Sequence, residues 1–193
     1  MTRRSGPRVT VTPATFTMVS YDSATIADLV AEAAEWVGFG PTDEIRIQIA
    51  EEQPLTDVVL VSDDPPSFAI DGGAFEDPRR PRQLDPVGVQ TVAVRSLARI
   101  GDRRRPGFGD APPEVDLTNA QADAWDAWAL GRASRRGLEV NQQRWRYRFR
   151  NRHGFTDAAD SVFERLWSTE DLTWADLAAA CQQTSDVTSS REH

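Results

Sequence analysis

Apolar residues in the first part of the chain are spaced first as in a strand and then as in a helix. Residues 9–19 are rich in β-branched residues, and Pro13 interrupts them, which is typical of an edge strand or a bulge. Over residues 22–37 the apolar positions follow the period of a helix, and Asp22 or Ser23 can cap its first turn. The pattern therefore predicts a strand followed by a helix.

Three further strand-like segments and a second helix follow. Isoleucines alternate with polar residues over 44–51, which predicts a half-buried strand, whereas the continuous apolar run 57–62 favours a more central strand. Residues 67–75 form the third candidate, which the pair Gly72 and Gly73 interrupts with a turn or bulge. Helical spacing returns over 85–100, and Gly101 is the predicted end of that helix. The predicted order of elements is β-α-β-β-β-α.

The second half of the chain is predicted to be helical. Apolar residues recur at helical spacing in several runs over 118–183, and proline and glycine are concentrated in residues 104–117. We therefore expect an α+β protein, in which a domain of residues 9–103 with a small antiparallel or mixed sheet is joined by this connector to a helical region. The ends of the chain, 1–8 and 184–193, lack apolar anchors and are predicted to be flexible tails.

The segment QQRWRYRFRNRHGF, residues 142–155, interleaves arginines with aromatic residues. In a strand, the aromatic and arginine side chains would lie on opposite faces, as in a sheet that binds nucleic acid. In a helix, Trp145 and Phe149 share a packing stripe that arginines flank, and only Tyr147 points away. We favour the helix because the neighbouring sequence is helical and offers no second strand for pairing. The candidate binding residues are Arg144, Arg146, Tyr147, Arg148, Arg150, Arg152 and His153.

The whole chain is acidic, whereas this segment is basic. The net charge is −8 and the pI about 4.8, while residues 132–153 hold eight arginines and one glutamate. Because no lysine occurs among the 22 basic residues, arginine is abundant everywhere and its presence alone does not indicate function. Three interpretations of the basic segment stay open: ion pairs within the chain, binding of nucleic acid or another phosphate ligand, and binding of an acidic protein partner. The candidate acids for pairs within the chain are Asp116, Asp123, Asp126, Asp157, Asp160 and Glu164. The acidic balance disfavours nucleic acid.

Common catalytic motifs do not occur in the sequence. The chain contains no GxxxxGK[ST], GxGxxG, HExxH or GxSxG. Its single cysteine, Cys181, excludes an intramolecular disulfide and is predicted to be a packing residue. His153 precedes a glycine, so we predict that it caps a helix C-terminus with a charged imidazole. We expect neither a metal nor a cofactor.

Location and assembly are only partly constrained by the sequence. No apolar run approaches the roughly 20 residues of a membrane-spanning helix, and the N-terminal arginines are not followed by the apolar stretch of a secretory signal. A single cysteine suits a reducing compartment, so we expect a cytoplasmic protein with no membrane interaction. The oligomeric state is not determined by these features.

Residues 71–85, DGGAFEDPRRPRQLD, are a secondary candidate site. Carboxylates there can coordinate a hard cation, and arginines can bind an anionic ligand. The alternative interpretation is a glycine turn followed by a proline-rich loop whose charges pair or stay solvated. The residues concerned are Asp71, Glu76, Asp77, Arg79, Arg80 and Arg82.

These observations support three hypotheses about function. The first is a noncatalytic binding or scaffolding module whose working surface is the helix of residues 138–153, with or without the loop of residues 76–82. The second is direct binding of nucleic acid or a phosphate ligand through the same helix. The third is an enzyme that uses the carboxylates and arginines of residues 71–85. Because the basic segment is the most unusual feature of an acidic chain, the first hypothesis is preferred.

Overall fold

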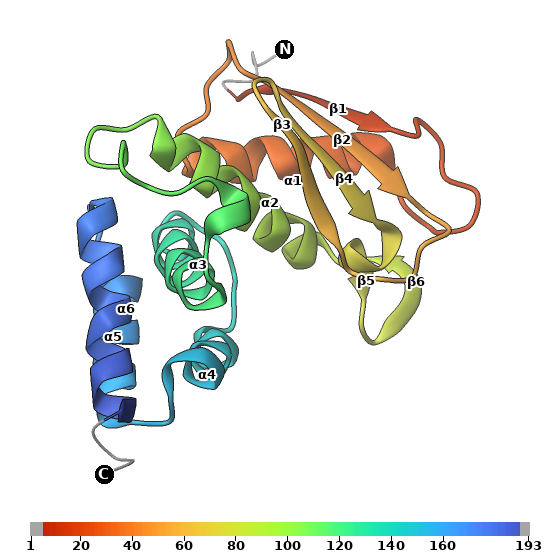
Figure 1. The fold of residues 1–193 in the computed structure, drawn as a ribbon. Coiled ribbons are helices and arrows are strands. Elements are labelled where there is room, and N and C mark those ends of the chain that lie inside the picture. The colour runs from red at the N-terminus through yellow and green to blue at the C-terminus, as the bar shows by residue number, and fades with distance from the viewer. Residues whose placement is uncertain (1–5, 190–193) are drawn as a thin grey trace. The chain divides into compact units, whose positions relative to one another are not determined.

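The structure, a computed structural model, describes residues 6–189 and has an α+β fold with a small mixed sheet (Figure 1). The predicted α+β class is therefore confirmed. Contacts between Cα atoms divide the chain into two compact units, and the division falls between Ile100 and Gly101. None of the helices among the described residues is long and apolar enough to cross a membrane.

The first unit contains the sheet. Its elements are β1 (Arg8–Thr12), α1 (Ser23–Trp36), β2 (Glu44–Ala50), β3 (Val58–Asp63), β4 (Pro66–Asp71), the 3-10 turn η1 (Gly72–Phe75), β5 (Glu76–Asp77), β6 (Arg80–Leu84) and α2 (Pro86–Arg103), which continues beyond the division. The four-stranded sheet has the order β1-β2-β4-β3. Strands β1, β2 and β4 are parallel, and β3 is antiparallel to β4. The sheet is thus mixed, because one hairpin is added to a parallel β-α-β arrangement.

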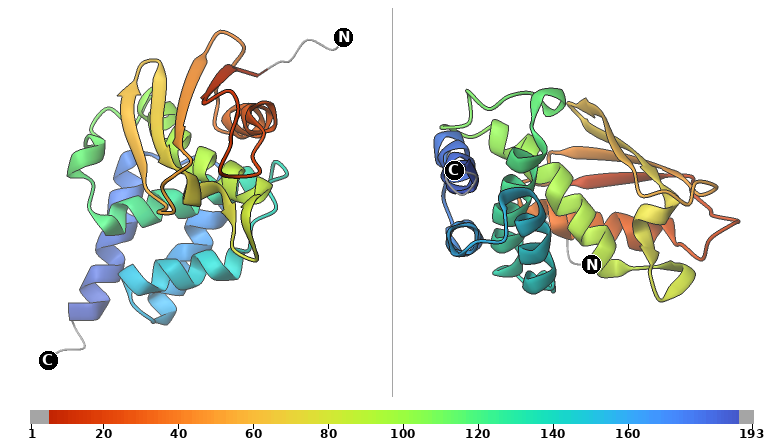
Figure 2. Two further views of the ribbon diagram at one scale, coloured as in Figure 1. Left: turned by 90° about the vertical axis from the view of Figure 1, so that its right-hand side faces the viewer. Right: turned by 60° about the horizontal axis from the view of Figure 1, so that its bottom comes forward.

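The core of the first unit lies between the sheet and its two helices. The isoleucines of β2 alternate with polar residues, so that Ile47 points inward while Arg46 and Gln48 are exposed on the opposite face. Val30 of α1 and Leu97 of α2 line the same small cavity as Ile47, so both helices cover one face of the sheet (Figure 2). The predicted half-buried strand of residues 44–51 is therefore present, and it is an internal strand.

Strand β3 lies at an edge of the four-stranded sheet, whereas the continuous apolar run of residues 57–62 favours a central position. Its burial alternates along the strand, and the outward-facing Val59 and Val61 are 56% and 68% exposed. A continuous apolar run normally fills a strand that is covered on both faces. Here only one face is covered, so the interpretation of residues 57–62 as central was wrong.

Two boundaries in the first unit also differ from those expected. One interpretation of residues 71–85 was a glycine turn followed by a loop, but η1 and the β5–β6 hairpin occupy most of them. Helix α2 does not end at Gly101 but continues through Arg103. A helix accepts an internal glycine at a cost of about 1 kcal/mol, which tertiary contacts can offset.

The second unit consists of helices. They are the 3-10 turn η2 (Glu114–Asp116), α3 (Asn119–Ser134), α4 (Gln142–His153), α5 (Asp157–Ser168) and α6 (Trp174–Ser189). Helix α3 contacts all three of the others, and every residue from Asp123 to Ala133 is buried. At Gly131 a Cβ atom would lie 2.2 Å from the Trp167 carbonyl oxygen, so glycine permits the close approach of α5. Helix α3 is therefore the central helix of this unit.

The predicted connector and tails are partly ordered in the described residues. Within the connector, 104–117, Phe108 is buried against the tryptophans of α3, and the Gly107 carbonyl oxygen accepts a hydrogen bond from Trp174 N at 3.0 Å. The predicted tails, 1–8 and 184–193, lie partly outside the described residues. Of the tail residues that the structure describes, Arg8 begins β1 and 184–189 belong to α6, whereas residues 6 and 7 precede β1.

Candidate functional site

The arginine-aromatic segment forms helix α4, as its helical interpretation predicted. The Asn141 side chain caps the helix by accepting a hydrogen bond from Arg144 N at 3.1 Å. Gly154 ends the helix at a φ of 93°. Phe149 is buried, and Tyr147 points away into solvent with 60% exposure. The segment therefore does not form the extended, nucleic-acid-binding sheet that was the alternative.

Four of the five arginines of α4 form ion pairs with carboxylates of the same unit. Arg148 Nε lies 3.0 Å from Asp123 Oδ1 and Arg152 Nε lies 3.6 Å from Asp123 Oδ2, so one carboxylate of α3 serves both. The remaining two pairs are Arg146 with Glu164 and Arg150 with Asp160, both of which connect α4 to α5.

The ion pair between Arg150 of α4 and Asp160 of α5 also affects the pKa of the Asp160 carboxyl. A hydrogen bond from Arg150 lowers the pKa of the Asp160 carboxyl below its usual value. The Arg150 guanidinium donates from Nε to Asp160 Oδ1 at 2.6 Å, and a second nitrogen contacts the other oxygen. This fork geometry is the strongest arrangement of an arginine and a carboxylate. The pair therefore orients α4 on α5.

Three side chains at and beyond the solvent face of α4 are exposed. Tyr147 and Phe155 are each 60% exposed and meet edge to face, with ring centroids 5.6 Å apart and an interplanar angle of 70°. Arg144 is exposed, and it forms no ion pair with any residue in the described range 6–189. Together these three residues are called the α4 aromatic patch. Large exposed aromatic side chains are typical of binding surfaces.

His153 is buried inside the second unit and does not cap α4 as predicted. Its ring stacks on Phe149 with centroids 3.9 Å apart. Nε2 lies 3.1 Å from the Ala120 carbonyl oxygen, and Nδ1 lies 2.8 Å from Thr184 Oγ1. A carbonyl oxygen only accepts, so Nε2 donates its proton to Ala120. The Thr184 hydroxyl has one proton, and Nδ1 and the Cys181 carbonyl oxygen, both 2.8 Å from Oγ1, are its two possible acceptors. The imidazole therefore connects the start of α3 to α6.

Burial lowers the pKa of His153 below its ordinary value of 6.5, although the hydrogen bond to Ala120 and the charge of Asp123 act in the opposite direction. Burial also raises the pKa of the Cys181 thiol to about 11, so this thiol stays protonated at neutral pH. Neither group has the properties of a nucleophile or of an exposed general base.

Acidification from about pH 7.5 to about pH 5.5 is expected to lower the free energy of unfolding through His153. Because the folded-state pKa lies below the unfolded value of 6.5, the unfolded chain binds the proton preferentially, and stability falls as the pH drops below 6.5. Urea unfolding at several pH values measures this loss. His153→Gln is expected to remove it, and the C-terminal His193 is common to both proteins. An unaltered pH dependence in this variant would contradict the assignment.

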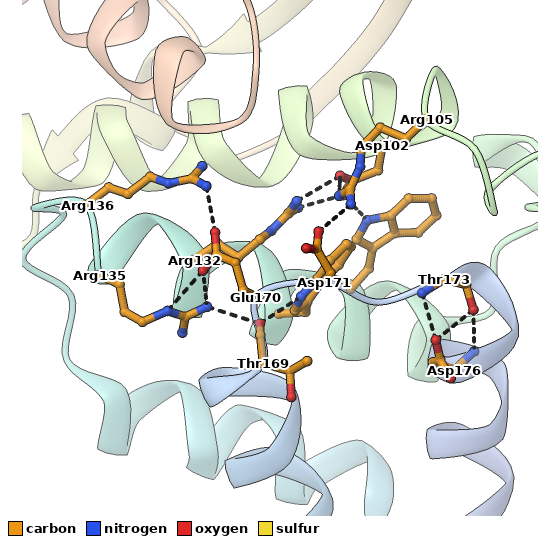
Figure 3. A network of polar contacts seen from close by, with 12 residues as sticks. Asp102, Arg105, Arg132, Arg135, Arg136, Thr169, Glu170, Asp171, Thr173 and Asp176 are labelled. Carbon is orange, nitrogen blue, oxygen red and sulfur yellow. Dashed lines mark hydrogen bonds and ion pairs between the residues drawn. The ribbon is translucent and has the colours of Figure 1, made fainter.

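The carboxylate of Asp102, which the sequence did not indicate as a site residue, is buried within a network of polar contacts in the second unit (Figure 3). Asp102 is 1% exposed and receives two hydrogen bonds from Arg132, at 2.9 and 2.7 Å. It also accepts from Trp125 Nε1 at 2.8 Å and from Arg105 at 3.1 Å. With four donors on two oxygens, Asp102 has little capacity left to bind a substrate or a metal. It is a structural centre.

The surroundings of this centre extend the network to the loop between α5 and α6. The Arg132 guanidinium lies over the Trp128 ring at 3.6 Å from its centroid, and Trp128 Nε1 donates to the Thr169 carbonyl oxygen at 3.1 Å. Nearby, Glu170 pairs with both Arg135 and Arg136. The only sequence signal for this arrangement was the spacing of Trp125, Trp128 and Arg132, which places these three residues on one face of a helix.

In the secondary candidate site, residues 71–85, the three carboxylates do not come together into one cluster. Asp77 accepts hydrogen bonds from Arg79 N and from Arg80 Nε, both at 2.8 Å, and so stabilises the turn of the β5–β6 hairpin. Arg82 has a φ of 62°, and its carbonyl oxygen accepts from Ser20 N. No group of three potential metal ligands occurs among the described residues, so Asp71 and Glu76 do not join Asp77 in such a cluster.

Comparisons with known proteins identify no relative. No protein-family model, no curated protein and no solved structure matches the chain. The functional argument therefore depends on the residues and geometry of this chain.

Proposed function

We propose that this protein is a binding or scaffolding module and that the α4 aromatic patch contacts a protein partner. The partner segment would supply apolar side chains to Tyr147 and Phe155, and a carboxylate to Arg144. The single observation that carries the proposal is the exposure of two adjacent aromatic rings, 60% each, beside an exposed arginine that has no ion pair in the described range. Tyrosine and arginine are the residues that most often dominate binding energy at interfaces.

Charge supports an acidic partner. Helix α4 contributes five arginines, and three carboxylates of the same unit pair with them, which leaves an excess positive charge of two. Arg148 and Arg152 share one carboxylate, and about half of each side chain is exposed. An acidic segment would therefore be attracted to the same side of α4, and its carboxylates would not have to displace the existing pairs.

Binding of nucleic acid or a phosphate ligand is the second candidate, with weaker support. Arg146 and Arg150 are tied to α5, and Arg148 and Arg152 to α3, so phosphate groups would have to compete with carboxylates of the protein. An enzyme that uses residues 71–85 has the least support, because Asp77 is engaged by its own hairpin. A cytoplasmic location remains part of the proposal and rests on the single cysteine.

The test is a selection of random peptides of about 12 residues, displayed on phage, against the wild-type protein. Retained sequences are expected to combine aspartate or glutamate with apolar residues. Their binding should weaken at least about tenfold in Tyr147→Ser/Phe155→Ser, because two aromatic contacts are lost. The matched control is Val115→Ser, which alters a side chain that is 90% exposed in the same unit. Val115→Ser is expected to bind like the wild type.

Two further variants separate this proposal from the alternatives. Arg144→Gln should weaken the binding of the selected peptides and reduce the salt dependence of that binding. Arg146→Gln/Arg148→Gln/Arg150→Gln should reduce stability, because it removes pairs to α3 and α5, and should have little effect on peptide capture if the folded protein remains. Peptides that bind the aromatic double variant normally would refute the proposal. Stronger, salt-dependent retention of a single-stranded oligonucleotide would favour the second candidate.

A further inference from the structure

We propose that the open edge of β3 accepts an extended peptide strand from another protein, with cationic residues at the ends of that strand. This inference concerns the first unit and is independent of the α4 aromatic patch. Strand β3 is the last strand of the order β1-β2-β4-β3, so only one of its sides pairs within the sheet. An unpaired strand edge is a template for an added strand.

The hydrogen-bonding register identifies which backbone groups face outward. Asp71 N donates to the Asp57 carbonyl oxygen at 3.0 Å, so these two residues form a hydrogen-bonded pair of the antiparallel ladder. Such pairs alternate, so Val59 also directs its backbone groups toward β4, while Val58 and Leu60 direct theirs outward. Because β3 has no neighbouring strand on that side in the described sheet, this register leaves the N–H and C=O groups of Val58 and Leu60 without a ladder partner. An incoming strand would find two donors and two acceptors there.

The side chains of this edge are unusually apolar for an exposed strand. Val59 and Val61 are 56% and 68% exposed, and Leu55, which precedes the strand, is 59% exposed. The opposite edge strand, β1, instead exposes Arg8, Thr10 and Thr12. Strand β3 contains no lysine, arginine or internal proline, which are common means of blocking an edge. Its register shift between Leu60 and Ser62 limits regular pairing to the first half of the strand.

Charge favours a basic peptide over a second copy of the chain. Exposed acidic residues lie at both ends of the strand, with Glu52 and Asp57 before it and Asp64 after it. Antiparallel pairing of two β3 strands would bring Asp57 of one copy close to Asp64 of the other, and like charges oppose such pairing. An extended segment with valine or threonine between two arginines would instead place cations beside these carboxylates.

The experiment uses a seven-residue peptide that alternates threonine and valine between two terminal arginines. Its binding to the full chain is measured by fluorescence anisotropy, and the amide protons of the protein by NMR hydrogen exchange. We expect exchange at Val58 and Leu60 to slow on peptide addition, whereas exchange at Val59 should not change. Val59→Lys/Val61→Lys should weaken binding at least about tenfold, because each lysine repels the arginines and removes an apolar contact. Thr10→Lys/Thr12→Lys, on the other edge, is the matched control and should bind normally.

Several outcomes would overturn the proposal. Strand addition at β3 would be excluded if the peptide did not bind at millimolar concentration. It would also be excluded if Thr10→Lys/Thr12→Lys weakened binding as much as the β3 variant does. Finally, a peptide that is N-methylated at alternate residues cannot form all the backbone hydrogen bonds, so undiminished binding of that peptide would exclude it. Sedimentation that shows a wild-type dimer, converted to a monomer by Val59→Lys/Val61→Lys, would assign the edge to a second copy instead. Circular dichroism checks that both double variants fold, and slowed exchange at Val58 and Leu60 in the wild type tests the pairing without any variant.

Discussion

Arg132→Met is expected to lower the free energy of unfolding by about 3–5 kcal/mol, because it leaves the buried carboxylate of Asp102 without its principal counter-ion. Both residues are almost inaccessible, with exposures of 5% for Arg132 and 1% for Asp102. The substitution also removes the guanidinium from the face of Trp128. Chemical unfolding followed by tryptophan fluorescence measures the change.

The control for this prediction is Arg144→Met, which removes the same charge from an exposed position that has no ion pair in the described range. Its expected effect is within about 0.5 kcal/mol. Adding Asp102→Asn to Arg132→Met should recover part of the loss, because a neutral amide is less costly to bury and still accepts from Trp125 Nε1. Similar effects of the two arginine variants would show that the pair of Arg132 with Asp102 does not stabilise the folded protein.

Trp128→Ala is expected to lower the free energy of unfolding by about 3–5 kcal/mol, the range for removing a fully buried tryptophan. Trp128 is 0% exposed, stacks on Phe108 at 5.7 Å with an interplanar angle of 3°, and supports Arg132 on its ring. The cavity left in α3 would adjoin the contact of Gly131 with α5, where the helices are too close to collapse further. Urea unfolding gives the measurement.

Trp128→Phe separates the two contributions of this side chain. It keeps an aromatic ring but removes the Nε1–H donor to the Thr169 carbonyl oxygen, so a smaller loss is expected than for Trp128→Ala. If the alanine variant lost less than about 1 kcal/mol, the packing of Phe108 and α3 would not stabilise this unit as described.

The local sequence determined which segments are helical and where several of them begin. Asp22 caps α1 by accepting from Thr25 N, and the capping box of Thr118 and Gln121 starts α3. The helical interpretation of α4 also followed from local spacing, because it placed Phe149 inward and Tyr147 outward. These features depend on residues within about one helical turn of each other, so a single sequence contains the necessary information.

Long-range pairing was decided only by the tertiary structure. The run of residues 57–62 is equally apolar in a central or an edge strand, so hydrophobicity did not reveal that β3 lies at the edge. His153 was expected to cap a helix, yet Thr184, 31 residues away, contacts it in the interior. Local spacing carries no information about such partners, because they meet only when distant segments pack.

In the candidate site, too, the local sequence determined some features and the tertiary structure determined others. The sequence identified the arginines of α4 and six acids that could pair with them. Only the tertiary structure showed that Asp123 of α3 and Asp160 and Glu164 of α5 are the partners. Phe155, outside the helix, became important only through its contact with Tyr147. Composition and periodicity determine which faces can be buried, whereas the exposure of a charged or aromatic side chain depends on which oppositely charged or apolar group the fold brings to it.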